Sequence, residues 1–173
     1  APKLERGLEA IAATQEAFTR ELVARGVDGI FYATNVATKN LLTPEEFRRF
    51  QRPYDRRILE AAGSLPFNIV HMCGGGILFE EFADCPVSVF SWATTTGNPS
   101  LTEVHRRTGR AVLGGLPAKP EIKTMTPEAL VARARASLAE AEGRHHLLGP
   151  DSSNPDTPEA LLHAVGEAVR KAA

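Results

Sequence analysis

The sequence predicts an α/β protein in which five parallel strands alternate with helices. Short apolar runs typical of buried strands are each followed by a segment whose apolar residues recur with helical spacing. The tripeptide Thr-Pro-Glu opens three of these helices, at residues 43–45, 126–128 and 157–159. Such alternation indicates parallel strands joined by right-handed crossovers. A complete (β/α)8 barrel takes about 250 residues. We therefore expect one domain, residues 1–173, that forms an open sheet or part of a barrel.

The first half of the chain holds two predicted strands and the strongest helix start. Gly26 marks the end of an amphipathic first helix, because glycine is favoured just past a helix end. Thr43 is the expected N-cap of a second helix, with Glu46 placed to close a capping box. The predicted elements of this half are helices at 4–25 and 44–62, strands at 27–33 and 67–72, an irregular loop at 34–42, and a short helix after Gly76.

The second half repeats the same plan. Each predicted strand is a short apolar run, and each is followed by a polar loop and a helix. On the last helix we expect Leu161, Leu162, Val165 and Val169 to face inward. The predicted elements of this half are strands at 86–92, 111–116 and 145–149, and helices at 101–108, from 127 to about 143, and after Pro158.

Composition excludes several classes of protein. The formal net charge is −1 and no block of Lys or Arg stands out, which argues against an electrostatic nucleic-acid binder. The apolar runs are far shorter than the roughly 20 residues of a membrane span. The chain opens as a charged amphipathic helix rather than a signal peptide, and two cysteines do not make a secreted disulfide framework. We therefore expect a cytoplasmic protein without nucleic-acid or membrane partners.

Residues with reactive side chains gather in the loops that follow the predicted strands. In parallel α/β folds these loops meet at one face, where ligands bind. Aromatic residues there also serve as packing, and a loop lysine is often simply solvated. The candidates on this face are Tyr32, Asn35, His71, Cys73, Trp92, Lys119 and Asp151.

His71 and Cys73 form the sharpest candidate site. They stand two residues apart at a strand end, so both side chains point the same way, and Gly74–Gly76 follow as a flexible turn. Imidazole and thiolate are usual zinc ligands, and a catalytic zinc takes three protein ligands. Asp151, at the end of the last strand, is the best acidic candidate for the third. The alternative is that His71 caps the strand and Cys73 is a small buried residue.

Three motifs resemble the C-terminal half of the uroporphyrinogen decarboxylase superfamily. They are Leu42-Thr-Pro-Glu-Glu-Phe-Arg-Arg-Phe with Pro53-Tyr54 following, Val112-Leu-Gly-Gly-Leu116, and Asn154-Pro-Asp-Thr-Pro-Glu159. Members of this superfamily fold as a (β/α)8 TIM barrel. The resemblance therefore implies that this chain supplies the C-terminal five βα units of such a barrel.

Two branches of this superfamily differ at residues present here. Decarboxylases usually carry Phe-Asp-Ser after the first of these strands, where this chain has Phe31-Tyr-Ala33. His71-Met-Cys73-Gly is similar to the zinc-binding His-x-Cys-Gly of methyltransferases that move a methyl group from a corrinoid protein to coenzyme M. The third zinc ligand of those enzymes is a Cys, and its position here is Asp151.

The resemblance implies three hypotheses. The leading one is a methyltransferase in which zinc activates a thiol that accepts a methyl group from a corrinoid protein or another donor. The second is a cofactor-free carboxy-lyase that decarboxylates acetate groups of a tetrapyrrole such as uroporphyrinogen III. The third is a non-catalytic half-barrel that acts as a partner module. A half-barrel exposes sheet edges, so we expect a second chain or an N-terminal half to complete it. The residues implied are His71, Cys73 and Asp151 for zinc, Asp151 for catalysis, and Tyr32, Asn35, Trp92 and Lys119 for substrate.

Overall fold

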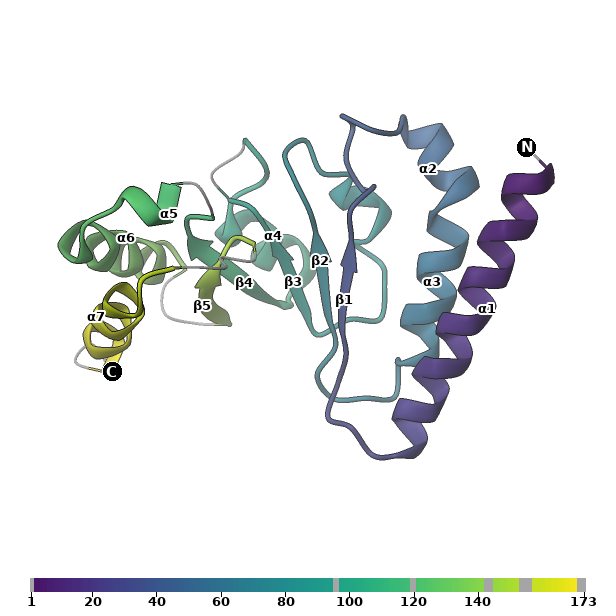
Figure 1. The fold of residues 1–173 in the computed structure, drawn as a ribbon, viewed down its shortest axis with the longest axis horizontal. Coiled ribbons are helices and arrows are strands. Elements are labelled where there is room, and N and C mark those ends of the chain that lie inside the picture. The colour runs from purple at the N-terminus through teal and green to yellow at the C-terminus, as the bar shows by residue number, and fades with distance from the viewer. Residues whose placement is uncertain (1, 95–96, 119–120, 142–144, 153–156, 171–173) are drawn as a thin grey trace. The chain divides into compact units, whose positions relative to one another are not determined.

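A computed structural model of the chain describes residues 2–94, 97–118, 121–141, 145–152 and 157–170. Its five strands form a parallel sheet in the order β1-β2-β3-β4-β5, which confirms the predicted α/β class (Figure 1). The chain divides into two compact units, residues 1–90 and 91–173, which are described in turn. The elements are α1 (Pro2–Ala24), β1 (Phe31–Thr34), α2 (Pro44–Phe50), α3 (Arg52–Ala61), β2 (Ile69–Met72), the 3₁₀ helix η1 (Phe79–Glu81), β3 (Val89–Trp92), α4 (Leu101–Thr108), β4 (Ala111–Leu116), α5 (Glu121–Thr124), α6 (Pro127–Glu140), β5 (His146–Pro150) and α7 (Glu159–Arg170).

In the first unit, β1 and β2 are paired in parallel, and α1 and α3 lie side by side next to β1 (Figure 1). The register places Ala33 opposite His71. Aromatic side chains fill the interior: Phe47 lies 5.5 Å from Phe82, and Phe79 meets Phe90 edge-on at 5.3 Å between ring centroids. This packing supports β2 and the segment that follows it.

The helix predicted at residues 44–62 is divided at Gln51. Thr43 forms the expected capping box with Glu46 at its start. Pro53 lacks an N–H and its ring would clash with the carbonyl of Arg49, so the helical ladder stops and α3 begins anew at Arg52. Gln51 takes a non-helical conformation, φ −129° and ψ −53°. The break leaves its side chain free to bond to the first turn of α3.

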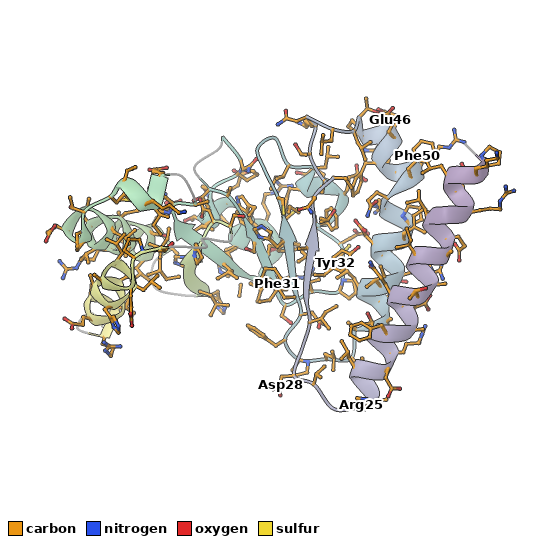
Figure 2. All side chains as sticks on the ribbon, in the orientation of Figure 1. Arg25, Asp28, Phe31, Tyr32, Glu46 and Phe50 are labelled. Carbon is orange, nitrogen blue, oxygen red and sulfur yellow. The ribbon has the colours of Figure 1, made fainter. Side chains whose placement is uncertain are left out.

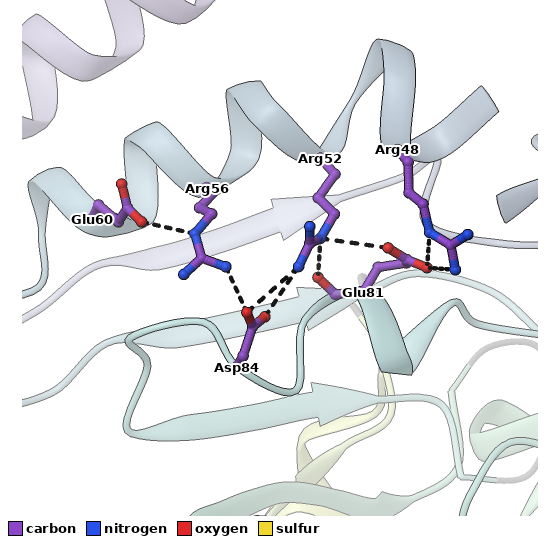
Figure 3. Close-up of polar contacts among 6 residues, drawn as sticks. All are labelled: Arg48, Arg52, Arg56, Glu60, Glu81 and Asp84. Atoms are coloured by element: carbon purple, nitrogen blue, oxygen red, sulfur yellow. Dashed lines mark hydrogen bonds and ion pairs between the residues drawn. The ribbon is translucent and has the colours of Figure 1, made fainter. Parts of the chain in front are cut away.

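A row of ion pairs joins α2 and α3 to the segment after β2 (Figure 3). Arg48 contacts the buried carboxylate of Glu81 at 2.8 Å, and Arg52 contacts it from the next turn. Arg56 contacts Asp84 at 2.6 Å, and its guanidinium holds the pKa of that carboxyl below its usual range. Because these arginines are spaced four residues apart across the break at Gln51, they fix α2 and α3 on the same segment.

The second unit contains a parallel β4–β5 pair with Val112 opposite His146 and Leu116 opposite Pro150. A separate apolar cluster packs α6 and α7 beside β4. The prediction that Leu162 faces inward is wrong: it is 56% exposed, because α7 turns Leu161, Val165 and the partly buried Val169 toward that cluster. The cluster consists of Leu116, Ile122, Leu130, Ala134, Leu161 and Val165.

None of the helices among the described residues is both long enough and apolar enough to cross a membrane.

Candidate functional site

His71 lies in β2 on the sheet face that also carries Phe31, and Cys73 directly follows the strand. His71 is buried, and its ring stacks on Phe31 with centroids 5.8 Å apart. Cys73 is half-buried, and its backbone N–H donates to the carbonyl of Thr34 at 3.1 Å. Burial raises the pKa of the Cys73 thiol, so the free side chain is a neutral thiol at neutral pH. The pair thus offers an imidazole and a partly accessible sulfur at one strand end.

The glycine turn after Cys73 is held by the loop after β1. Gly74 and Gly76 both have positive φ, 84° and 64°, which favours glycine at these positions. The carbonyl of Gly75 accepts hydrogen bonds from the Thr38 hydroxyl and the Asn40 amide, and Lys39 N–H donates to Gly76. The position of Cys73 is therefore fixed by two loops.

Asp151 follows β5 in the second unit and is fully buried. Its carboxylate accepts hydrogen bonds from the backbone N–H of Thr94 at 2.7 Å, the Thr94 hydroxyl at 2.9 Å and the N–H of Gly115 at 2.9 Å. Gly114 leaves room for this carboxylate, because a Cβ there would lie 3.2 Å from Asp151 Oδ1 and would push it away by a few tenths of an ångström. Asp151 therefore joins the loop after β3 to β4, and a metal ion would compete with these donors for its oxygens.

A metal centre needs several ligand atoms that converge on one point. Within the described residues, His, Cys, Asp and Glu side chains form no group of three that could hold a metal ion. Imidazole and thiolate are usual zinc ligands, and the role of His71 and Cys73 as two of them stays a prediction. Asp151 belongs to the other unit, so its role as a third ligand stays a prediction.

The four predicted substrate-binding residues occupy different surroundings. Trp92 is fully buried, and its Nε1–H donates to the Pro99 carbonyl at 2.9 Å. Asn35 is exposed just after β1. Tyr32 lies on the opposite side of β1 from Phe31, facing α3 (Figure 2). Lys119 lies outside the described residues.

Sequence reasoning missed a buried polar cluster around Asp55 in the first unit. Asp55 is 1% exposed, and its Oδ1 accepts hydrogen bonds from the Tyr32 hydroxyl and the Gln51 side-chain amide. Burial raises the pKa of Asp55 from 3.8 to about 6, against the effect of these hydrogen bonds. Burial and the nearby carboxylate raise the pKa of Tyr32 far above its usual range. Helical spacing indicates that Asp55 is on the buried face of α3, because it precedes the inward residue Ile58 by three positions and Leu59 by four.

Comparison with known proteins identifies relatives of the fold. The family model described as Uroporphyrinogen decarboxylase (URO-D) matches residues 2–172. A methyltransferase from Methanosarcina mazei has a similar structure, with a TM-score of 0.80 and 22% identity, over 96% of this chain and 49% of that one. A B12-independent methionine synthase from Shewanella sp. W3-18-1, solved with selenomethionine, gives a TM-score of 0.64 and 22% identity over 94% and 54%. No curated protein matches the sequence.

The chain therefore spans about half the length of the structures it resembles. At 22% identity this likeness establishes the fold, and it is consistent with part of a TIM barrel.

Proposed function

Since the chain belongs to the uroporphyrinogen decarboxylase (URO-D) family, we propose that it forms part of an enzyme that transfers a methyl group to a thiol. The observation that carries this proposal is the pair His71 and Cys73, two residues apart at the carboxyl end of β2, with the glycine turn directly after it. The names of the two similar structures, a methyltransferase and a methionine synthase, add support.

In the proposed reaction the substrate thiol loses its proton, its sulfur bonds to the methyl carbon, and the bond between that carbon and the donor breaks. A zinc ion held by His71 and Cys73 would lower the pKa of the thiol, so that the thiolate would form at neutral pH. His71 is oriented for this task by its stack on Phe31, and Cys73 by its backbone bond to Thr34. The donor is a corrinoid protein or another methyl carrier.

Zinc binding by the purified chain tests this proposal. We expect about one zinc per chain after loading and dialysis, measured by mass spectrometry. In competition with a coloured chelator, His71→Ala and Cys73→Ser should each weaken binding by more than about 100-fold, since even the loss of an outer-shell partner costs 10–100-fold. Asp151→Asn should weaken it too if Asp151 is the third ligand.

Two matched controls separate ligand loss from general damage. Cys85→Ala removes the other thiol, which is buried, and His163→Ala removes an exposed imidazole on α7. Both variants should bind zinc as the wild type does. Absence of zinc under every loading condition, or equal binding by the Cys73→Ser and Cys85→Ala variants, would contradict the proposed site.

A second candidate, decarboxylation of tetrapyrrole acetate groups, is favoured by the description of the matching family model. In the structure, Tyr32 and Trp92 both donate hydrogen bonds inside their own units, so lining a macrocycle would require them to turn outward. Uroporphyrin fluorescence quenched by the chain, without any need for zinc, would favour this candidate. Binding of neither zinc nor porphyrin would favour the non-catalytic module.

We also propose that other strands complete the barrel, supplied by the same protein, a second chain or a second copy. Phe31 and Phe67 are 59% and 44% exposed beside the first edge strand, which is unusual for aromatic residues of a finished core. At micromolar concentration, light scattering should show a mass above that of one chain, and Phe31→Ser should reduce it. Leu162→Ser on α7 serves as the control. A wild-type chain that is a stable monomer would contradict this proposal.

A further inference from the structure

One peptide group of β4 lies between the imidazole of His146 and the carboxylate of Asp151. It is the peptide between Gly114 and Gly115, the linking peptide. Its N–H, on Gly115, donates to Asp151 Oδ1 at 2.9 Å. Its carbonyl, on Gly114, accepts a hydrogen bond from Nε2 of His146 at 3.0 Å. All of these residues belong to the second unit, in which β4 and β5 are neighbours (Figure 1).

The carbonyl acceptor determines which nitrogen of His146 carries the proton. A carbonyl oxygen can only accept, so the proton of this bond is on Nε2. Nδ1 of the neutral ring is buried, and none of the described residues pairs with it. Buried polar atoms are normally paired, so an apolar ring would suit packing alone better than this imidazole does. The hydrogen bond to the linking peptide is what a histidine supplies here and a phenylalanine cannot.

A hydrogen bond to the carbonyl of a peptide group also affects its N–H. In a trans peptide the C=O and N–H bonds point in opposite directions, so His146 and Asp151 approach the linking peptide from opposite sides. Hydrogen bonds in such a chain polarise one another and are strengthened by roughly 10–30% per bond. The bond from His146 therefore makes Gly115 N–H a better donor and fixes the direction in which it points.

The glycine at position 115 leaves the space that this arrangement needs. Gly115 has a φ of 99°, in the region that favours glycine. A Cβ there would overlap with the side chain of Ser137 on α6 and would lie 3.4 Å from Nε2 of His146. A larger residue would thus displace either the serine or the imidazole from the linking peptide.

We propose that His146 is a positioning residue for Asp151, acting through the linking peptide. Its hydrogen bond aims Gly115 N–H at Oδ1, while the N–H of Thr94 holds Oδ2 at 2.7 Å. The carboxylate is thereby kept in one orientation. The chemical consequence rests on the proposed function, because Asp151 is the residue expected to be the third zinc ligand. His146 itself acts only through the peptide.

NMR of the isotope-labelled chain without zinc tests the proposal. In the wild type, the ring nitrogen shifts of His146 should show the proton on Nε2. A scalar coupling across the hydrogen bond should connect the Gly115 nitrogen to the carboxyl carbon of Asp151. His146→Phe keeps a ring but removes the donor, and should reduce this coupling at least about twofold, since hydrogen bonds weaken steeply as their geometry worsens. His146→Gln offers an amide N–H in place of Nε2 and should restore most of the coupling.

A second imidazole bonded to a backbone carbonyl provides the matched control. Nδ1 of His105 donates to the carbonyl of Arg110 at 2.8 Å in the same unit. His105→Phe should therefore leave the coupling unchanged. General loosening is followed by solvent exchange of the Asp151 amide, which donates to Leu116 at 2.8 Å rather than to the linking peptide. In His146→Phe this exchange should remain at the wild-type rate, whereas a merely structural histidine would speed it up.

Zinc affinity is a separate readout of the same variants. If Asp151 is a zinc ligand, His146→Phe should weaken zinc binding by about tenfold, as the loss of an outer-shell partner does. If the chain binds no zinc, the proposed function fails, while the coupling still decides the role of His146. A wild-type proton on Nδ1, no coupling in the wild type, or an equal coupling in His146→Phe would overturn the proposal.

Discussion

Gly29→Ala should prevent the first unit from folding. A Cβ on Gly29 would lie 1.4 Å from the carbonyl oxygen of Phe67 and 2.3 Å from its carbonyl carbon. Neither backbone can move away easily, because Phe67 N–H donates to Asp28 at 3.0 Å and Ile69 N–H donates to Ile30 at 2.8 Å. The conflict is between two main chains rather than with a flexible side chain. We therefore expect a loss of more than about 4 kcal/mol in the free energy of unfolding.

Gly7→Ala is the matched control for this substitution. Gly7 lies inside α1, and a Cβ there would meet nothing within 4 Å. Alanine is favoured over glycine in a helix interior, so this variant should gain about 1 kcal/mol. Denaturant unfolding followed by circular dichroism measures both. A Gly29→Ala variant that unfolds like the wild type would show that β1 and β2 do not enter the sheet in the register that sets His71 opposite Ala33.

The sequence predicted the fold best where a single local pattern determines the structure. The strand predicted at 111–116 has the same bounds as β4, because a short apolar run between turn residues is compatible with few structures other than a buried strand. The capping box of Thr43 and Glu46 was likewise confirmed. The break at Gln51 was missed because the helical spacing of apolar residues continues through it, whereas Pro53 acts on the backbone hydrogen bonds.

The candidate site was harder to predict, because its geometry depends on residues distant in the sequence. The spacing of His71 and Cys73 reveals that they share a face, but not that Phe31 covers the imidazole. Nothing local to Asp151 indicates that Thr94 and Gly115 donate to its carboxylate. Asp55 was not singled out from the sequence, although a carboxylate on the inward face of a helix is unusual.

Removing the charge of Asp55 should make the protein more stable at neutral pH. Burial raises the pKa of this carboxyl from 3.8 to about 6 in the folded state, so the folded chain holds the proton more tightly than the unfolded chain. Well below pH 3.8 the carboxyl is protonated in both the folded and the unfolded state, so its ionisation does not change the free energy of unfolding. As the pH rises from about 4 to 6, the unfolded state loses its proton first, and stability falls by about 3 kcal/mol in all.

Asp55→Asn removes this dependence, since its amide does not titrate and still offers an oxygen to Tyr32 and Gln51. In urea unfolding at pH 4, 5, 6 and 7.5, the variant should gain stability relative to the wild type as the pH rises, by up to about 3 kcal/mol. Asp84→Asn should show the opposite trend, because Arg56 lowers the pKa of that carboxyl and favours its charged form. A difference between Asp55→Asn and the wild type that does not change with pH would mean that Asp55 is not a buried acid.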